Sequence, residues 1–287
     1  MANVNEPATD PATGQAGLPP TLRTVLCDLD GVVWLAREPI PGSADAVARL
    51  RAAGCRVVFV TNNSGDRIAS HEEALAAIGI EAAGDVITSA QAAALLVDAG
   101  ERVLVCGGEG VVESLGERRA LVVDDGPCDV VVVGIDRRFD YDRLTRASRA
   151  VRGGARLIGT NDDATFPTPS GPIPGGGSIV AAVATASGVA PVVAGKPHGP
   201  MVTLARRVAG PIDAGSALVV GDRPSTDGAF AGAIGCGFAL VRSGVTGPGV
   251  RLPPGVGPTP VLDVADLAAV ADAVVQVLDR AASRPAR

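Results

Sequence analysis

Residues 23–34 read R-T-V-L-C-D-L-D-G-V-V-W, an apolar run that ends in two aspartates and a glycine. The run predicts a buried strand over 24–29, and strands without alternating polarity are typical of parallel sheets covered on both faces. In extended backbone, residues i and i+2 point to the same side, so Asp28 and Asp30 are expected to lie together. Such carboxylates repel each other when ionised, and a divalent cation would relieve the repulsion. The alternative is a solvated acidic turn before the next helix.

On both sides of this segment, apolar runs alternate with Ala-rich segments of helical periodicity. Further strands are predicted at 56–61, 102–106, 121–124, 129–134, 156–160, 192–194, 217–221 and 237–242. Helices are predicted at 42–54, 69–78, 89–99, 110–115, 141–152, 178–187, 200–209, 227–234 and 265–282. This alternation predicts an α/β fold with a Rossmann-like, doubly wound parallel sheet.

The composition of the chain excludes several classes of protein. The chain has 287 residues, of which 47% are apolar and only 2% aromatic, so its core must consist mainly of aliphatic side chains. A net charge of −6 without a basic run argues against nucleic-acid binding. No apolar run is long enough for a membrane span, and residues 1–20 suggest a disordered tail rather than a signal peptide. The five cysteines form no CxxC pair and indicate reduced thiols in a cytoplasmic protein: Cys27, Cys55, Cys106, Cys128 and Cys236.

A second acidic pair follows the predicted strand over 217–221. Asp222 comes directly after it, and Asp227 lies five residues later near the start of a predicted helix. Carboxylates from two strand ends would suit Mg²⁺, which binds through one or two carboxylates together with phosphate oxygens and waters. The alternative for Asp227 is helix capping, because acids are favoured at helix N-termini.

Two further strand ends carry polar groups. Thr61, Asn62 and Asn63 end the strand over 56–61 and offer hydroxyl, amide and backbone donors to phosphate oxygens, although a simple turn would use the same residues. Lys196 follows the strand over 192–194 and is the only lysine in the chain. It would supply a compact positive charge to a phosphate, unless it is an ordinary surface lysine.

Together these segments resemble the haloacid dehalogenase superfamily of aspartyl-nucleophile phosphatases. CDLDGVVW, VVFVTNN, AGKP and VVGDRPSTD look like its four motifs in order. GTND at 159–162, PGGGS at 174–178 and RSGVT at 242–246 resemble the branch that contains 4-nitrophenylphosphatases, NagD-like nucleotidases and glycerol-3-phosphate phosphatases. One departure is Pro224-Ser225, where that branch usually has a Leu-acid pair.

The resemblance implies roles for individual residues. Asp28 matches the nucleophile and Asp30 the general acid/base. The Asp28 carboxylate, the Asp30 backbone carbonyl and Asp222 would bind Mg²⁺, with Asp227 near the metal. The phosphate would contact the remaining matched residues: Thr61, Asn62, Asn63 and Lys196.

The resemblance also implies a domain plan: a catalytic core over 21–86 and 187–287 and an inserted α/β cap over 87–186. The expected reaction is magnesium-dependent hydrolysis of small phosphomonoesters, with glycerol 3-phosphate and phosphoglycolate as candidates. A nucleotidase, a phosphotransferase and a non-catalytic phosphate-binding module are the alternatives. Relatives often pair through the cap, so a homodimer is expected; neither a nucleic-acid nor a membrane partner is.

One motif is not explained by the resemblance. Residues 106–110 read C-G-G-E-G after a predicted strand and before a helix, which invites comparison with a dinucleotide-binding loop. The third glycine of that fingerprint is missing, so a tight strand–helix turn is the preferred interpretation.

Overall fold

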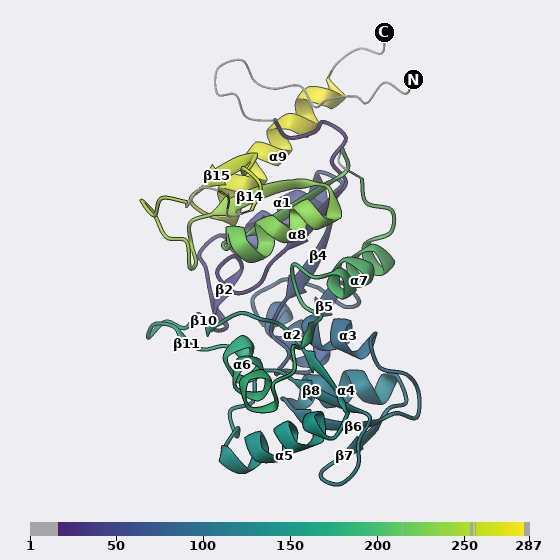
Figure 1. Ribbon diagram of the computed structural model, residues 1–287. Coiled ribbons are helices and arrows are strands. Elements are labelled where there is room, and N and C mark those ends of the chain that lie inside the picture. The colour runs from purple at the N-terminus through teal and green to yellow at the C-terminus, as the bar shows by residue number, and fades with distance from the viewer. Residues whose placement is uncertain (1–16, 214, 253–254, 256, 284–287) are drawn as a thin grey trace, which may run out of the picture. The chain divides into compact units, whose positions relative to one another are not determined.

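The computed structural model describes residues 17–283 except 214, 253–254 and 256 (Figure 1). The tail predicted over residues 1–20 therefore falls almost wholly outside the described residues. The chain folds into two compact units. Among the described residues, unit 1 comprises those within 17–59, 78–80 and 209–283, and unit 2 comprises residues 60–77 and 81–208.

A six-stranded sheet has the order β15-β14-β13-β1-β4-β5. Its strands are β1 (Thr24–Cys27), β4 (Arg56–Thr61), β5 (Val86–Thr88), β13 (Ala217–Gly221), β14 (Gly237–Val241) and β15 (Leu262–Val264). β1 lies between β4 and β13 and is parallel to both. Numbered along the chain, the order is 6-5-4-1-2-3, which is that of the doubly wound Rossmann fold, with the reversal of direction between β1 and β13. The predicted fold class is thus confirmed.

A five-stranded parallel sheet lies in unit 2, in the order β12-β9-β8-β6-β7. Its strands are β6 (Arg102–Cys106), β7 (Leu121–Val123), β8 (Val130–Val133), β9 (Arg156–Gly159) and β12 (Val192–Val193). The four valines of β8 are completely buried, as expected of a central strand covered on both faces. Numbered along the chain the order is 5-4-3-1-2, a second doubly wound arrangement.

The helices alternate with these strands. They are α1 (Ser43–Ala52), α2 (Ile68–Ala77), α3 (Ser89–Ala94), α4 (Glu109–Glu117), α5 (Tyr141–Arg152), α6 (Gly176–Ser187), α7 (Gly199–Ala209), α8 (Ala229–Ile234) and α9 (Leu267–Ala282). In unit 2, α5 and α6 lie side by side and cover one face of the sheet (Figure 1). Val151 of α5 and Val183 of α6 belong to the same buried apolar cluster as Val131 of β8. Capping residues fix where several helices begin: Asp140 accepts a hydrogen bond from the N–H of Arg143 at the start of α5.

Several predicted bounds differ from those observed. The helix predicted over 89–99 ends at Ala94, and the one predicted from 227 begins at Ala229 after a π-helical turn, η1 (Pro224–Gly228). Short strands had no detectable periodicity and were not predicted: β5, β15 and the two ribbons formed by β2 (Trp34–Leu35) with β3 (Glu38–Pro39) and by β10 (Thr165–Phe166) with β11 (Ile173–Pro174). No helix within the described residues is long and apolar enough to cross a membrane.

Candidate active site

Three carboxylates meet where the direction of winding reverses in the six-stranded sheet. Asp28 follows β1 and Asp222 follows β13, and the register that pairs Cys27 with Val220 brings these two strand ends together. Asp227 completes the group from η1. One ligand atom from each of the three residues lies within 4.8 Å of the others. In doubly wound sheets, ligands bind outside the carboxyl ends of strands at this point.

The backbone encloses Asp222 closely. Its side chain is 1% exposed, and its Oδ2 accepts a hydrogen bond of 2.5 Å from the N–H of Val245. A Cβ at Gly31 would come within 2.4 Å of this carboxylate, and one at Gly244 within 2.0 Å. Gly31 also has a φ of +96°, which side-chain-bearing residues rarely adopt. The glycine after the D-L-D segment is therefore required by both backbone conformation and space.

Asp227 is equally buried, at 1% exposed. Its Oδ2 accepts a hydrogen bond of 3.1 Å from the N–H of Arg223, so it closes the turn that opens η1. A Cβ at Gly221 would lie 2.2 Å from the Asp227 carboxyl carbon. Asp227 therefore holds the first turn of η1, whereas α8 begins after Gly228 without a side-chain cap.

Asp30 and its neighbours form a compact turn. Asp30 is partly buried and forms an isolated bridge with Trp34, while the N–H of Gly31 donates to the Trp34 carbonyl at 2.7 Å. The hydroxyl of Ser243 donates to the Gly31 carbonyl at 2.7 Å. The Asp30 side chain is not a member of the carboxylate group formed by the described residues.

The carboxylate group has the chemistry of a magnesium site. Mg²⁺ prefers oxygen ligands, and it is usually held by one or two carboxylates while substrate phosphate and water complete the octahedron. Asp222 and Asp227 are both 1% exposed, and Asp28 lies beside them, so the group can offer several carboxylate oxygens to one ion. The residues present therefore fit this metal.

In unit 2, Asn62 is bound directly to the backbone of Lys196. Asn62 Oδ1 accepts a hydrogen bond from the Lys196 N–H at 2.8 Å, and Asn62 Nδ2 donates to the Lys196 carbonyl at 3.2 Å. The same Nδ2 donates to Asp163 Oδ2 at 2.7 Å. Lys196 is 2% exposed and is therefore not a surface lysine. The structure thus brings together two predicted residues that are 134 positions apart.

The other predicted residues of this strand end form a turn. Thr61 is 1% exposed, and its hydroxyl accepts a hydrogen bond from the N–H of Asn63 at 3.0 Å. Asn63 Oδ1 accepts from the N–H of Gly65 at 2.9 Å, and Asn63 Nδ2 donates to Asp66 at 3.2 Å. The turn that was the alternative interpretation of these residues is thus present, and both polar atoms of the Asn63 side chain form hydrogen bonds within it.

Residues that the sequence did not single out support Asn62. Its carbonyl accepts hydrogen bonds of 2.7 Å from both Asn161 Nδ2 and Ser89 Oγ. Asn161 lies in the G-T-N-D segment, which had been noted only as part of the resemblance. Beside it, Asp162 Oδ2 lies 3.0 Å from Nε2 of His198, which gives His198 a defined partner. Only the folded chain shows these contacts, since they join residues 27 to 99 positions apart.

Comparisons with known proteins identify the family to which this chain belongs. A family model described as haloacid dehalogenase-like hydrolase matches residues 25–118, and a related HAD hydrolase-like model matches residues 193–269. A 5′-nucleotidase of Bacillus subtilis is 35% identical over 79% of this chain and 89% of its own length. The chain belongs to the haloacid dehalogenase-like hydrolases.

Other members of this hydrolase family extend the match. The D-glycerol 3-phosphate phosphatase of Mycobacterium tuberculosis is 40% identical over 77% of this chain, which spans 63% of that relative's length. The solved structure of a p-nitrophenyl phosphatase from Archaeoglobus fulgidus is 32% identical, with a TM-score of 0.81 over 88% of this chain and 99% of that one. The M. tuberculosis glycerol phosphate phosphatase in complex with magnesium gives a TM-score of 0.78 at 33% identity, over 90% of this chain and 78% of that one. The predicted phosphatase branch and the class of phosphoric monoester hydrolase are confirmed.

Proposed function

We propose that this hydrolase is a magnesium-dependent phosphatase of small phosphorylated metabolites, with Asp28 as its nucleophile. The observation that carries the proposal is the group formed by Asp28, Asp222 and Asp227, which lies where a doubly wound sheet binds its ligands. Asp28 directly follows β1, the central strand that pairs with both β4 and β13. Mg²⁺ bound there would supply positive charge that lets an anionic carboxylate approach an anionic phosphate.

The proposed reaction has two steps, both of which use Asp28 and Asp30. An Asp28 carboxylate oxygen attacks phosphorus, the phosphorus–oxygen bond to the leaving group breaks, and Asp30 donates its proton to the departing alkoxide. Asp30 then accepts a proton from water, which attacks the aspartyl-phosphate and releases inorganic phosphate. Together the two steps consume one water and return Asp28 and Asp30 to their starting states.

Thr61, Asn62, Asn63 and Lys196 are proposed to receive the phosphate oxygens. The hydrogen bonds of Asn62 to both backbone groups of Lys196 support this role, because they fix the loop that carries the only lysine. A fixed ammonium stabilises the charge of the transferring phosphoryl group without reorganisation during the reaction. Asn63 would contribute through its backbone N–H groups rather than its side chain, which bonds within the turn.

Glycerol 3-phosphate is the first substrate to test, and phosphoglycolate the second. The 40% identity to a glycerol 3-phosphate phosphatase supports the first choice, and the 35% identity to a 5′-nucleotidase keeps nucleoside monophosphates as the alternative. A magnesium-dependent screen across phosphorylated metabolites, ranked by kcat/KM, decides between them. Phosphate transfer to added glycerol or ethanol instead of water would identify a phosphotransferase.

The direct test of the mechanism is Asp28→Asn. We expect this variant to retain the wild-type circular dichroism spectrum and to lose release of 4-nitrophenol from 4-nitrophenyl phosphate. Near-normal turnover by the variant would disprove the role of Asp28. An inactive wild-type chain across the whole screen would instead favour a non-catalytic phosphate-binding module.

The domain plan and the assembly are also proposals. We assign the core to 21–86 and 187–287 and the cap to 87–186, and we expect a cytoplasmic homodimer that pairs through the cap. Within that segment β7 is an edge strand whose Leu121 and Val122 are 53% and 41% exposed, and such edges favour pairing with another chain. The free thiols of all five cysteines support a reducing compartment. Light scattering of the wild type and of Leu121→Glu tests the dimer.

A further inference from the structure

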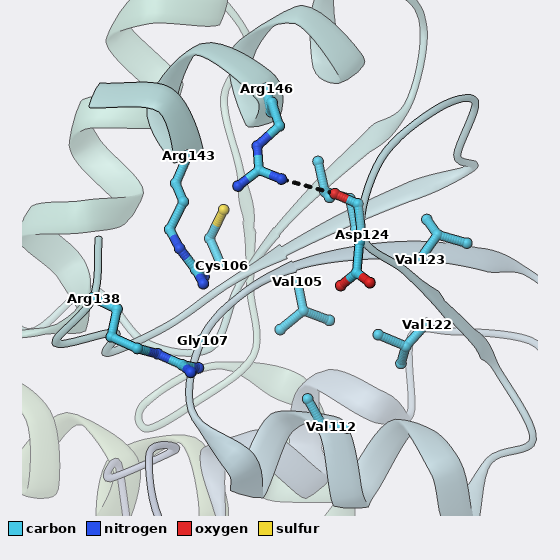
Figure 2. Close-up of a pocket in the computed structure, with 11 residues that line it drawn as sticks. Val105, Cys106, Gly107, Val112, Val122, Val123, Asp124, Arg138, Arg143 and Arg146 are labelled. Atoms are coloured by element: carbon cyan, nitrogen blue, oxygen red, sulfur yellow. Dashed lines mark hydrogen bonds between the residues drawn. The ribbon is translucent and has the colours of Figure 1, made fainter. Parts of the chain in front are cut away.

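Unit 2 contains a cavity of about 140 Å³ that the proposed reaction does not use. Its floor is aliphatic, with Val105, Val112 and Val122, and arginines project into it from the other side (Figure 2). The polar lining consists of Asp124, Arg138, Arg143 and Arg146. Cavities with an apolar wall and a few convergent polar groups are typical of ligand sites.

The cavity lies at the carboxyl ends of two neighbouring strands of the five-stranded sheet. The chain forms β6 first, then places β7 on one side of it and β8 on the other. The cavity is lined by the carboxyl ends of β6 and β7 and by α5, which follows β8. In doubly wound sheets, ligands bind outside the carboxyl ends of the strands, and the cavity lies at this edge of the sheet.

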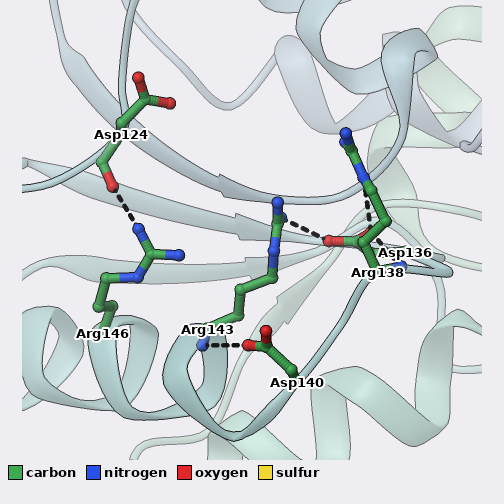
Figure 3. A network of polar contacts seen from close by, with 6 residues as sticks. All are labelled: Asp124, Asp136, Arg138, Asp140, Arg143 and Arg146. Carbon is green, nitrogen blue, oxygen red and sulfur yellow. Dashed lines mark hydrogen bonds and ion pairs between the residues drawn. The ribbon is translucent and has the colours of Figure 1, made fainter.

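Charge at the cavity favours an anion. Arg143 pairs at 2.7 Å with Asp136, whose side chain is 2% exposed, and Arg138 lies 3.9 Å from the same carboxylate (Figure 3). One buried carboxylate is therefore shared by two guanidinium groups. Arg146 donates to the backbone carbonyl of Asp124 at 3.0 Å and has no carboxylate within 4.0 Å among the described residues.

The charge of Asp124 opposes this excess. Its carboxylate lies on the cavity wall and points away from the guanidinium group of Arg146 (Figure 2). Among the side chains that line the cavity, three arginines outnumber one aspartate, so the lining itself is positive, and Asp136 and Asp140 lie beside it and reduce this excess. Arginine forks also match the geometry of phosphate and carboxylate oxygens, with two parallel N–H donors.

The size of the cavity excludes a dinucleotide, since drug-sized and cofactor-sized ligands occupy about 300–1,000 Å³. The glycines of the C-G-G-E-G segment have another explanation. A Cβ at Gly108 would come within 2.2 Å of the Gly65 carbonyl oxygen, and one at Gly110 within 2.1 Å of that of Asp66. These glycines admit a neighbouring backbone and not a pyrophosphate.

We propose that this cavity binds a small oxyanion, either inorganic phosphate or a compact phosphate or carboxylate group, through Arg138, Arg143 and Arg146. Inorganic phosphate is the first probe, because the proposed reaction releases it. The site is separate from the carboxylate group of unit 1 and does not depend on the proposed function.

Binding is measured by titrating ¹⁵N-labelled protein with inorganic phosphate in the presence of a metal chelator. The backbone amides of Gly107 and Asp124 report on the cavity, and that of Gly31 reports on the carboxylate group. We expect saturable shifts at Gly107 and Asp124 in the wild type. In Arg138→Gln/Arg146→Gln the dissociation constant should rise at least about tenfold, as expected when charge-assisted hydrogen bonds are lost. The phosphatase rate of this double variant should stay at the wild-type value.

Two further variants make the test specific. Arg149 lies on α5 like Arg143 and Arg146, is exposed and does not line the cavity. The Arg149→Gln variant should therefore bind phosphate with the wild-type dissociation constant. Asp124→Asn removes the opposing charge and should bind phosphate more tightly. Malonate, titrated in parallel, shows whether carboxylates are preferred. Absence of saturable shifts with both anions, or equal constants for the double variant and Arg149→Gln, would overturn the proposal and leave the arginines as supports for α5.

Discussion

Asn62 bonds both the N–H and the carbonyl group of Lys196 through one side-chain amide, at 2.8 and 3.2 Å. Asp163 accepts the second hydrogen atom of the same amide nitrogen at 2.7 Å. This orientation leaves the amide no freedom to flip, because exchanging oxygen and nitrogen would break all three contacts. Asp163 is thus a positioning residue for the loop that carries Lys196.

Asp163 is assigned no contact with substrate, yet Asp163→Ala should reduce activity, because it releases the amide that holds the Lys196 loop. We expect kcat/KM for 4-nitrophenyl phosphate to fall about tenfold, as when one oriented hydrogen bond of a catalytic site is lost. Asp162→Ala is the matched control, because Asp162 contacts His198 instead. Equal kinetics for the two variants would contradict the role of Asp163.

Metal dependence should follow from Asp222. Chelation should abolish activity, and added Mg²⁺ should restore it. Asp222→Asn should raise the Mg²⁺ concentration needed for half-maximal activity at least about tenfold, since an amide oxygen is a weaker ligand than a carboxylate. Asp45→Asn, at an exposed position of α1, should titrate like the wild type. An unchanged Mg²⁺ requirement in Asp222→Asn would exclude this residue as a ligand.

Gly31 provides a steric test of the carboxylate group. Gly31→Ala should lower the free energy of unfolding by about 1–3 kcal/mol and reduce kcat strongly, because the new Cβ strains a positive φ and displaces Asp222. Gly54 also has a positive φ, +88°, but a Cβ there would meet nothing within 4 Å. Gly54→Ala should therefore show a comparable backbone strain and wild-type kcat. Denaturant titrations and steady-state rates separate the two effects.

The raised pKa values of two buried thiols predict how the free energy of unfolding depends on pH. Burial raises the pKa of Cys106 to about 11 and that of Cys236 to about 12. In the unfolded chain a thiol loses its proton at about pH 8.5, so these two thiols stay protonated to a higher pH in the native state than in the unfolded chain. Their contribution to stability is complete below about pH 8.5 and is lost as the pH rises toward 11 and 12.

Urea midpoints measured from about pH 8 to about pH 10.5 should therefore decline, and Cys106→Ala/Cys236→Ala should flatten the decline. At about pH 8 both thiols of the folded protein should resist iodoacetamide, because the thiolate is the reactive form. A double variant that declines as steeply as the wild type would show that other groups cause the pH dependence.

Long, strongly patterned segments were predictable from the sequence. The bounds predicted at 56–61, 102–106, 141–152 and 217–221 agree with those of β4, β6, α5 and β13, because each has a continuous apolar run or a clear helical period. The π-helical turn at 224–228 was not predictable, since the contact of Asp227 with the Arg223 N–H imposes it. Asp28, Asp222 and Lys196 were identifiable from their positions at strand ends. Asp163 was not, because its contact with Asn62 spans 101 residues and appears only in the folded chain.

The burial of Lys196 has a practical consequence. Apart from the α-amino group, the chain contains a single primary amine, and that amine belongs to a residue only 2% exposed. Besides the α-amino group, amine-directed reagents would therefore find one internal position in the native protein. Acylation followed by peptide mass spectrometry would count events at that one loop, and a ligand that covers it would be detected as protection, with no need for mutation or an attached probe.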